Sequence, residues 1–238
     1  MSKNIKIVLG SIYLIILIAF LYFIFSKFDI SRISDFSYYK NIQINLEELI
    51  GKNLIFNLIL FFLFSVIWVV LLGFGSPILI MSGILFGKWV GTIISTVSIS
   101  FGVLSLYIIA SYFFKDLVNQ ILKVRFEKYI ERFQKNEFYF FFIFRFAGGL
   151  GIPFALQNVL PVIFKMKNYN YFFASFFGFI PSFFIWNTIG SGINKFIKEA
   201  DEFNFINLIF SKEIYFPYIV FIILIFISIL VKKNFFND

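Results

Sequence analysis

The stretch 145–154, RFAGGLGIPF, decides how this chain folds, because it interrupts an apolar run with an arginine, three glycines and a proline. The ten residues from 138 to 147 would form about 15 Å of helix, half of the ~30 Å hydrocarbon core of a bilayer. The glycines and the proline then favour a break, and apolar character resumes over 154–164. Two half-length helices around such a tip predict a re-entrant hairpin.

The composition assigns the chain to the membrane. It has 238 residues, 60% hydrophobic and 14% charged, with a mean hydropathy of +0.90. Apolar windows exceed the ~18 residues that mark a transmembrane helix. We therefore expect an all-α integral membrane protein. Hydropathy alone places spans near 7–25, 54–72, 89–113, 168–190 and 214–231.

A second interruption resembles the first. GFGSP at 73–77 and GLGIP at 149–153 share the pattern G-x-G-x-P, and a shift of 76 residues superposes them without a gap. The same shift places Phe101-Gly102 on Phe177-Gly178. These matches predict an internal repeat in which each unit is a surface helix, a hairpin and one full span. The predicted hairpin tips are Gly73, Gly75, Pro77, Gly149, Gly151 and Pro153.

The repeat predicts the topology. The surface helix of the second unit is expected at 115–135 and that of the first at roughly 44–60, so 61–72 becomes a hairpin arm. A single crossing at 89–113 separates the two hairpins, so they enter from opposite faces of the membrane. The expected fold has about four full transmembrane helices plus two re-entrant hairpins in an inverted-topology repeat. Whether 54–72 instead spans the membrane stays open.

The expected organisation has three parts. Residues 1–40 form an N-terminal membrane anchor and linker, without a small-residue cleavage site after MSKNIK. Residues 41–192 form the core, with repeat one at 41–113 and repeat two at 115–190. Residues 193–238 form a loop and a C-terminal transmembrane helix.

The charges give an orientation for this topology. The N-terminus, 114–137, 164–167 and the C-terminal tail carry net charges of +2, +2, +2 and +1 and twelve Lys/Arg residues. The opposite loops, 26–53 and 191–213, carry 0 and −1. The positive-inside rule then predicts cytoplasmic N- and C-termini. The AT-rich residue bias and the absence of an organelle signal favour a bacterial inner membrane.

Arg145 is the main candidate for function. It lies about eight residues, or 12 Å, in from the charged boundary at Glu137. A charge at that depth costs at least about 2.5 kcal/mol and marks a functional site by default. Arginine suits a phosphate or carboxylate, although it could instead cap the carbonyl groups of the hairpin tip. The accompanying polar candidates for substrate binding are Gln157, Asn158, Ser76 and Ser82.

Other features favour structural roles. For each amide or hydroxyl alone, hydrogen bonding between helices is the favoured role, and Asn187 and Thr188 lie near the end of a span. Gly178 and Pro181 predict a helix kink. Lys88 and Trp89 are expected as interfacial anchors. Close helix packing is predicted for Gly83, Gly87 and Gly91.

Several functions are excluded. The chain has no cysteine and no histidine, so disulfides, thiolate chemistry and a Ser-His-Asp triad are ruled out. No metal-ligand cluster, P-loop or cofactor motif is present, and no acid lies inside an apolar segment. The basic residues are spread over short loops, which argues against nucleic acid as a partner. We expect no metal, no cofactor and no enzymatic activity.

The residues also resemble a known family. Segments 76–91 (SPILIMSGILFGKWVG), 144–161 (FRFAGGLGIPFALQNVLP) and 172–192 (FFASFFGFIPSFFIWNTIGSG) are similar to the VTT-domain membrane proteins, which include the DedA-like and SNARE-associated Golgi proteins. The arginine, Pro153-Phe154, Asn158, and Gly178 with Pro181 carry the resemblance. It implies two re-entrant hairpins in inverted orientation. It also implies lipid handling, by scrambling of phospholipids or recycling of a polyprenyl-phosphate carrier.

The sequence therefore predicts a transporter, scramblase or flippase for a lipid with an anionic headgroup. Its partners would be phosphate-bearing membrane lipids, and an oligomer is compatible with the sequence. Two alternatives stay open. An ion-coupled carrier of a small solute would need a closed cavity and a gradient. A membrane-organising scaffold would depend on the surface helices and not on Arg145.

Overall fold

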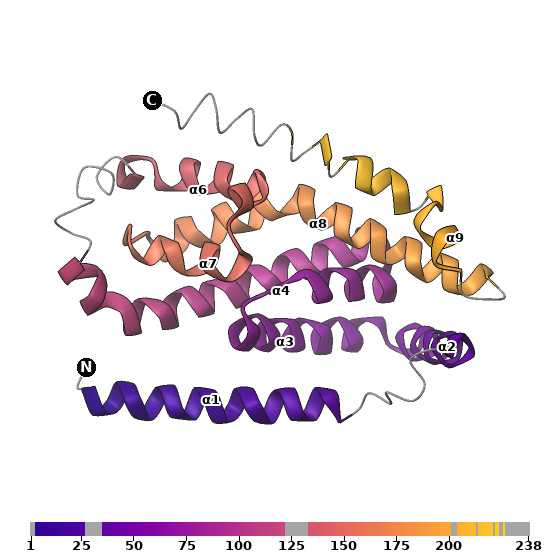
Figure 1. Ribbon diagram of the computed structural model, residues 1–238, viewed down its shortest axis with the longest axis horizontal. Coiled ribbons are helices and arrows are strands. Elements are labelled where there is room, and N and C mark those ends of the chain that lie inside the picture. The colour runs from indigo at the N-terminus through magenta and orange to yellow at the C-terminus, as the bar shows by residue number, and fades with distance from the viewer. Residues whose placement is uncertain are drawn as a thin grey trace.

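A computed structural model of the chain describes residues 3–26, 35–121, 133–200, 204–212, 214–220, 222, 223 and 226. This part of the chain is helical almost throughout and contains no strand (Figure 1). Its helices are α1 (Lys3–Phe25), α2 (Phe36–Lys52), α3 (Leu54–Leu72), α4 (Ser76–Ile121), α6 (Glu137–Phe146), α7 (Phe154–Val159), α8 (Asn168–Glu199) and α9 (Phe205–Ile209). Two short 3₁₀ helices, η2 (Gly148–Gly151) and η3 (Leu160–Val162), flank α7.

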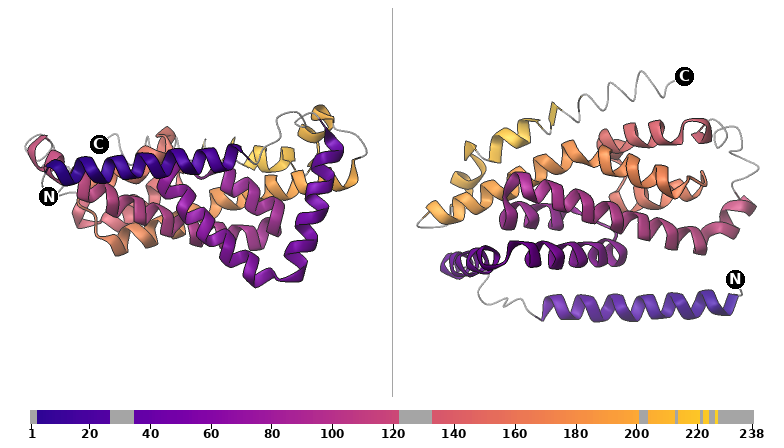
Figure 2. Two further views of the ribbon diagram at one scale, coloured as in Figure 1. Left: turned by 90° about the horizontal axis from the view of Figure 1, so that it is seen from below. Right: turned by 180° about the vertical axis from the view of Figure 1, so that it is seen from behind.

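The antiparallel pair of α4 and α8 forms the centre of the fold. The ring of Tyr107 stacks on that of Tyr171 with centroids 4.4 Å apart. Gly91, which precedes Tyr107 on α4, lies against Asn187, which follows Tyr171 on α8. The two helices therefore run in opposite directions. α3 packs on α4, and α6 packs on α8. Figure 2 shows the same order from behind, with α1 on the outer side of α3.

Glycines bring α4 and α8 to within backbone contact. A Cβ atom at Gly83 would lie 2.3 Å from the backbone oxygen of Asn187, and one at Gly190 would lie 2.2 Å from that of Ile80. Only a residue without a side chain fits at such separations. The close packing predicted for Gly83 is therefore observed.

α4 doubles back on itself at Gly87. The φ angle there is 74° and ψ is 175°, a backbone conformation that residues other than glycine rarely adopt. A Cβ atom at Gly91 would lie 2.7 Å from the backbone oxygen of Ser82, whereas nine residues of straight helix would separate them by about 13 Å. Residues 76–86 thus form a short arm that folds back along the helix starting at Lys88.

The boundary between the first two core helices differs from the expected one. A surface helix at 44–60 and a hairpin arm at 61–72 were predicted, and both ranges are wrong. α2 ends at Lys52, because the side chain of Asn53 accepts a hydrogen bond from the amide of Phe56 and so caps the start of α3. α3 is consequently 19 residues long and long enough to cross a membrane.

α2 has the direction of a surface helix. Figure 1 shows it end-on, whereas α1, α3, α4 and α8 lie side-on. Its Glu47 pairs with Lys198 near the end of α8, and the carboxylate also accepts a hydrogen bond from Asn194 at 3.2 Å. This contact fixes α2 across the end of the central pair.

Four of the described helices are long and apolar enough to cross a membrane: α1, α3, α4 and α8. The number agrees with the expected four, but α3 is one of them in place of 214–231, eight of whose eighteen residues lie outside the described part of the chain. So does most of the predicted surface helix 115–135. α4 continues past 113 to Ile121, and α8 runs unbroken through Gly178 and Pro181 to Glu199. The kink predicted there therefore stays a prediction.

We expect Gly83→Ala to destabilise the protein by at least about 1–3 kcal/mol, because the new methyl group would force α4 away from the backbone of α8. The measurement is the thermal unfolding midpoint of purified protein in detergent. Gly51→Ala is the matched control, since nothing lies within 4 Å of a Cβ atom at Gly51. A native midpoint for Gly83→Ala would contradict the packing described here.

The contact of Glu47 predicts a pH dependence. Burial raises the pKa of Glu47, but the hydrogen bonds from Lys198 and Asn194 and the charge of Lys198 lower it further, so the net pKa lies below its ordinary value. A lowered pKa in the folded state stabilises the fold above the ordinary value, and this stabilisation is lost as the pH falls through the lowered pKa. Glu47→Gln should reduce the unfolding midpoint by up to about 3 °C at pH 7 and have no effect near pH 3. Glu48→Gln, next to it on α2, controls for the general loss of one acid.

Candidate functional site

α6 begins with a buried acid that holds it against α8. Glu137 is 6% exposed, and its carboxylate accepts hydrogen bonds from the backbone amide of Lys167 and, at 2.6 Å, from the side chain of Asn170. Both donors lie at the N-terminus of α8. The backbone N–H of Lys167 is there because the first N–H groups of a helix have no partner within it, and Asn170 adds its side-chain amide from the first turn. Glu137 thus caps α8 from another helix and sets the depth of the following ten residues.

Arg145, near the end of α6, is enclosed by protein and 1% exposed. Its guanidinium donates to the side-chain oxygens of Gln157 at 3.0 Å and Asn158 at 2.7 Å, and to the hydroxyl of Tyr171 at 3.1 Å. Every one of these acceptors is neutral. Among the described residues, no acid pairs with Arg145, so its positive charge has no countercharge there.

Aromatic rings complete the enclosure. The guanidinium carbon lies 4.7 Å from the ring centroid of Phe141 and 4.8 Å from that of Phe179, with Phe154 and Tyr171 farther out at 5.7 and 5.8 Å. Ring faces attract a cation, most strongly where water is excluded. The rings therefore offset part of the cost of burying the charge. They also separate it from its surroundings, so Arg145 does not line an open cavity in this structure.

The hairpin tip is fastened through Gln157. Its amide nitrogen donates to the backbone oxygen of Ile152 at 2.6 Å, while its oxygen accepts from Arg145. Gly148 and Gly149 turn the chain with φ angles of 68° and 75°. A Cβ atom at Gly149 would lie 2.0 Å from the Gln157 amide nitrogen, so a glycine is required for the tip to close over this side chain.

A second polar cluster lies farther along α8. Asn187 is fully buried and bonds two serines of α4, with its oxygen accepting from Ser82 and its nitrogen donating to Ser95 at 3.1 Å. Asn187 and Thr188 were expected near the end of a span. α8 continues for twelve residues beyond Asn187, so the helix itself does not end there, and the position of these two residues relative to the membrane stays a prediction.

The predicted site residues therefore divide into three places. Arg145, Gln157 and Asn158 come together, Ser82 lies in the cluster around Asn187, and Ser76 is exposed at the start of α4. Tyr171 and Asn187 mark the two clusters on α8, and sixteen residues of helix separate them by about 24 Å. α6 and the short arm of α4 thus meet different parts of α8.

Buried polar atoms without a hydrogen-bond partner occur in and between the clusters. They are Arg145 Nε, Asn158 Nδ2, and the hydroxyls of Thr96, Ser100 and Ser175. Thr96 and Ser100 share the face of α4 that carries Tyr107. Ser175 follows Tyr171 by one turn of α8. The α4–α8 interface therefore has unused hydrogen-bonding capacity between the two clusters.

Sequence reasoning missed Tyr171, and the 76-residue shift contained the signal. That shift pairs Ser82 with Asn158 and Ser95 with Tyr171. In each cluster one side chain bonds both members of such a pair, Asn187 in the first and Arg145 in the second. Applying the shift to polar residues would have indicated Tyr171. For a metal, the described residues offer no group of three acidic side chains.

Four apolar helices of spanning length and charged or polar groups enclosed between them define an integral membrane protein of the all-helical class. The model of the VTT domain family matches residues 73–192, just over half of the 238-residue chain. This chain belongs to the VTT-domain family, that of the DedA-like and SNARE-associated Golgi proteins. No curated protein and no solved structure matches it significantly.

The hydrogen bond from Arg145 to the hydroxyl of Tyr171 predicts that removing this one oxygen atom lowers the stability of the protein. Tyr171→Phe keeps the ring that stacks on Tyr107 but removes an acceptor for the guanidinium, which should destabilise the protein by about 1–3 kcal/mol. Tyr169→Phe is the matched control, because Tyr169 is 70% exposed. Thermal unfolding in detergent measures both. Equal midpoints for the two variants would show that the hydroxyl of Tyr171 does not stabilise the site.

Proposed function

We propose that this protein moves lipids with phosphate-bearing headgroups across the membrane, as a transporter or scramblase without enzymatic activity. One observation carries the proposal. Arg145 is a buried cation between apolar helices, and its hydrogen-bond partners among the described residues are all neutral. An arginine without a countercharge in a medium of low dielectric constant attracts an anion strongly. A lipid phosphate is the anion that a membrane supplies.

The site suggests how a phosphate is exchanged with protein groups. The oxygens of Gln157 and Asn158 occupy the positions on the guanidinium that a phosphate would take in a bidentate contact. A charged acceptor binds about twice as strongly as a neutral amide. Displacing Gln157 would also release its hydrogen bond to Ile152 and so loosen the tip. Headgroup binding and opening of the hairpin are thereby coupled in this proposal.

We further infer that two re-entrant hairpins form an inverted repeat. Gly73 and Gly149, 76 residues apart, have φ angles of 70° and 75°. Gly102 packs against Val69, and Gly178 packs against Arg145; a Cβ atom would lie 2.8 and 2.5 Å away, respectively. The same shift relates both members of these contacts. Such agreement supports two similar units, an architecture that gives transporters a site accessible from either side.

The distribution of basic residues supports cytoplasmic N- and C-termini. With the residue bias noted above, it favours the inner membrane of a bacterium. In this orientation the start of α6 faces the cytoplasm, and the end of α8 with α2 faces the outside.

Transbilayer movement of labelled phosphatidylglycerol and of a polyprenyl phosphate, in liposomes with purified protein, tests the function. Arg145→Ala should abolish the acceleration, but it also leaves a void in the fold. Asn158→Asp is the sharper variant, because Asn158 Nδ2 has no partner and the new carboxylate would pair with Arg145 in place. We expect it to keep the native unfolding midpoint and to slow movement at least about tenfold, since a fixed carboxylate competes with the phosphate.

Asn136→Asp is the matched control, the same substitution at an exposed position before α6. It should move lipid at the native rate. Native rates in Asn158→Asp and in a folded Arg145→Lys variant would assign Arg145 a structural role only. No acceleration by the native protein for any anionic lipid would overturn the proposal and favour a solute carrier or a scaffold.

A further inference from the structure

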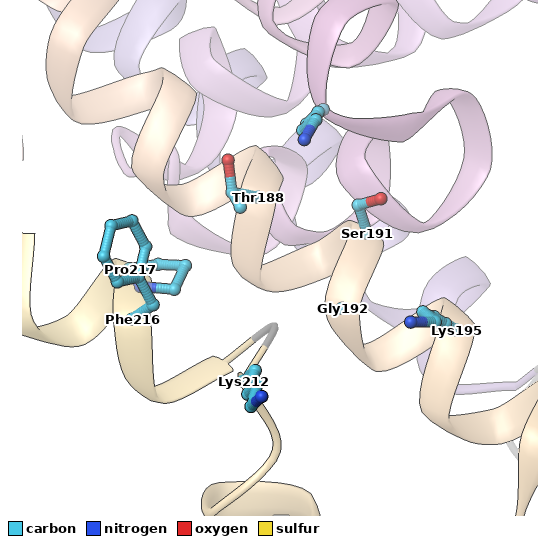
Figure 3. A pocket seen from close by; sticks show the side chains of 8 residues that line it. Thr188, Ser191, Gly192, Lys195, Lys212, Phe216 and Pro217 are labelled. Atoms are coloured by element: carbon cyan, nitrogen blue, oxygen red, sulfur yellow. The ribbon is translucent and has the colours of Figure 1, made fainter.

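A recess of about 440 Å³ lies beside the C-terminal half of α8, whereas Arg145 of α6 contacts the N-terminal half of α8. Three segments build it, as Figure 3 shows for α8 and the C-terminal segment. α8 contributes Thr188, Ser191 and Lys195 along one face. Lys88, which directly follows the turn of α4 at Gly87, also lines the recess, and so does Lys212 in the segment after α9. The volume is within the range that holds a small ligand or a lipid headgroup.

The recess has the chemistry of an anion site. Three lysines line it, and none of the described residues on its wall is acidic. Lys88 precedes Lys195 by 107 residues, and Lys212 follows Lys195 by 17, so the fold and not a local charge run brings them together. Lys88, Lys195 and Lys212 all have exposed side chains. The hydroxyl of Ser191 adds a hydrogen-bond donor within the same concavity. Ammonium and hydroxyl donors converging on one space favour a group with several negative oxygens.

The surroundings indicate a lipid as the source of that group. Phe216, which is 63% exposed, and Pro217 form an apolar side of the recess. Trp89 adjoins Lys88, is 66% exposed and lies 4.9 Å from the ring of Phe184. Exposed aromatic residues beside lysines are typical of the level of lipid headgroups. A headgroup could therefore bind the lysines while its glycerol and acyl chains contact the apolar side.

The recess also borders the polar interior of the protein. Thr188 follows Asn187 directly, and Ser191 lies one turn beyond it. The cluster of Asn187, Ser82 and Ser95 thus separates the recess from the unpaired hydroxyls that continue along the α4–α8 interface. A phosphate in the recess would lie at one end of this interface, and Arg145 lies near the other.

We propose that this recess binds the phosphate-bearing headgroup of an anionic membrane lipid, as a second site distinct from Arg145. Its role as the entry or exit site for transport rests on the proposed function, whereas the binding itself does not.

The experiment measures binding of a fluorescent short-chain phosphatidic acid to the full-length protein in neutral detergent. The triple variant Lys88→Gln, Lys195→Gln, Lys212→Gln should bind it on the order of 100-fold more weakly. Its fold should persist, because all three side chains are exposed. The control variant Lys135→Gln, Lys165→Gln, Lys167→Gln removes the same charge from exposed positions near the opposite end of α8 and should bind almost as tightly as the native protein.

Competition separates the two sources of phosphate. We expect unlabelled phosphatidylglycerol to displace the probe and millimolar inorganic phosphate to leave it bound. Full displacement by inorganic phosphate would make the recess a site for soluble anions and overturn its assignment to lipid. Equal weakening in both triple variants, or none in the first, would overturn the recess as a specific site.

The two proposals fail separately. Asn158→Asp should bind the probe at the recess normally even where lipid movement is lost. Binding that depends on the three recess lysines, in a native protein that moves no lipid, would support the recess and reject the transport function.

Discussion

The backbone contact between α4 and α8 is the constraint on which the other features depend. Helices gain little from hydrophobic burial inside a membrane, so packing and hydrogen bonding must hold them together. Gly83 and Gly190 remove the side chains from the crossing, and Asn187 then reaches two serines of α4. Because α8 carries α6 on its first half and contacts the short arm of α4 on its second, this pair positions both of these shorter segments.

The second constraint is electrostatic. A cation at the depth of Arg145 is costly, and a carboxylate partner would be the simplest compensation. The chain uses amide oxygens, a tyrosine hydroxyl and ring faces instead. Such partners hold the arginine without neutralising it, and Gly178 lets α8 approach so closely that a Cβ atom there would meet that of Arg145 at 2.5 Å. The charge of Arg145 has no countercharge among the described residues, which is the property on which the proposed binding of an anionic headgroup depends.

The polar groups between these helices form a series and not one cavity. Four polar groups follow one another beside α8, from its N-terminal to its C-terminal end. They are Arg145 with its partners, the hydroxyls of Ser175, Ser100 and Thr96, the cluster of Asn187, and the lysine recess. Buried hydroxyls can bond carbonyl groups of their own helix, so they are inexpensive to keep inside a membrane. They also offer donors and acceptors when two helices shift. A series of this kind agrees with stepwise passage of a headgroup between two faces.

Local chemistry allowed the sequence to predict much of this protein. Apolar run lengths predicted a helical membrane protein, and glycine and proline marked both interruptions of the apolar runs. A charge inside an apolar run indicated Arg145 as the main candidate for function. The repeat misplaced the limits of α2 and α3, whereas hydropathy alone placed a span at 54–72, the range of α3. Apolar character begins at Leu54, directly after Asn53, whose side chain caps the start of α3. Tertiary structure alone decided that Asn187 is buried between two serines of α4 and that Lys88, Lys195 and Lys212 share one recess. These residues are far apart along the chain or ordinary in composition, and only the packing of α8 against the other segments brings them together.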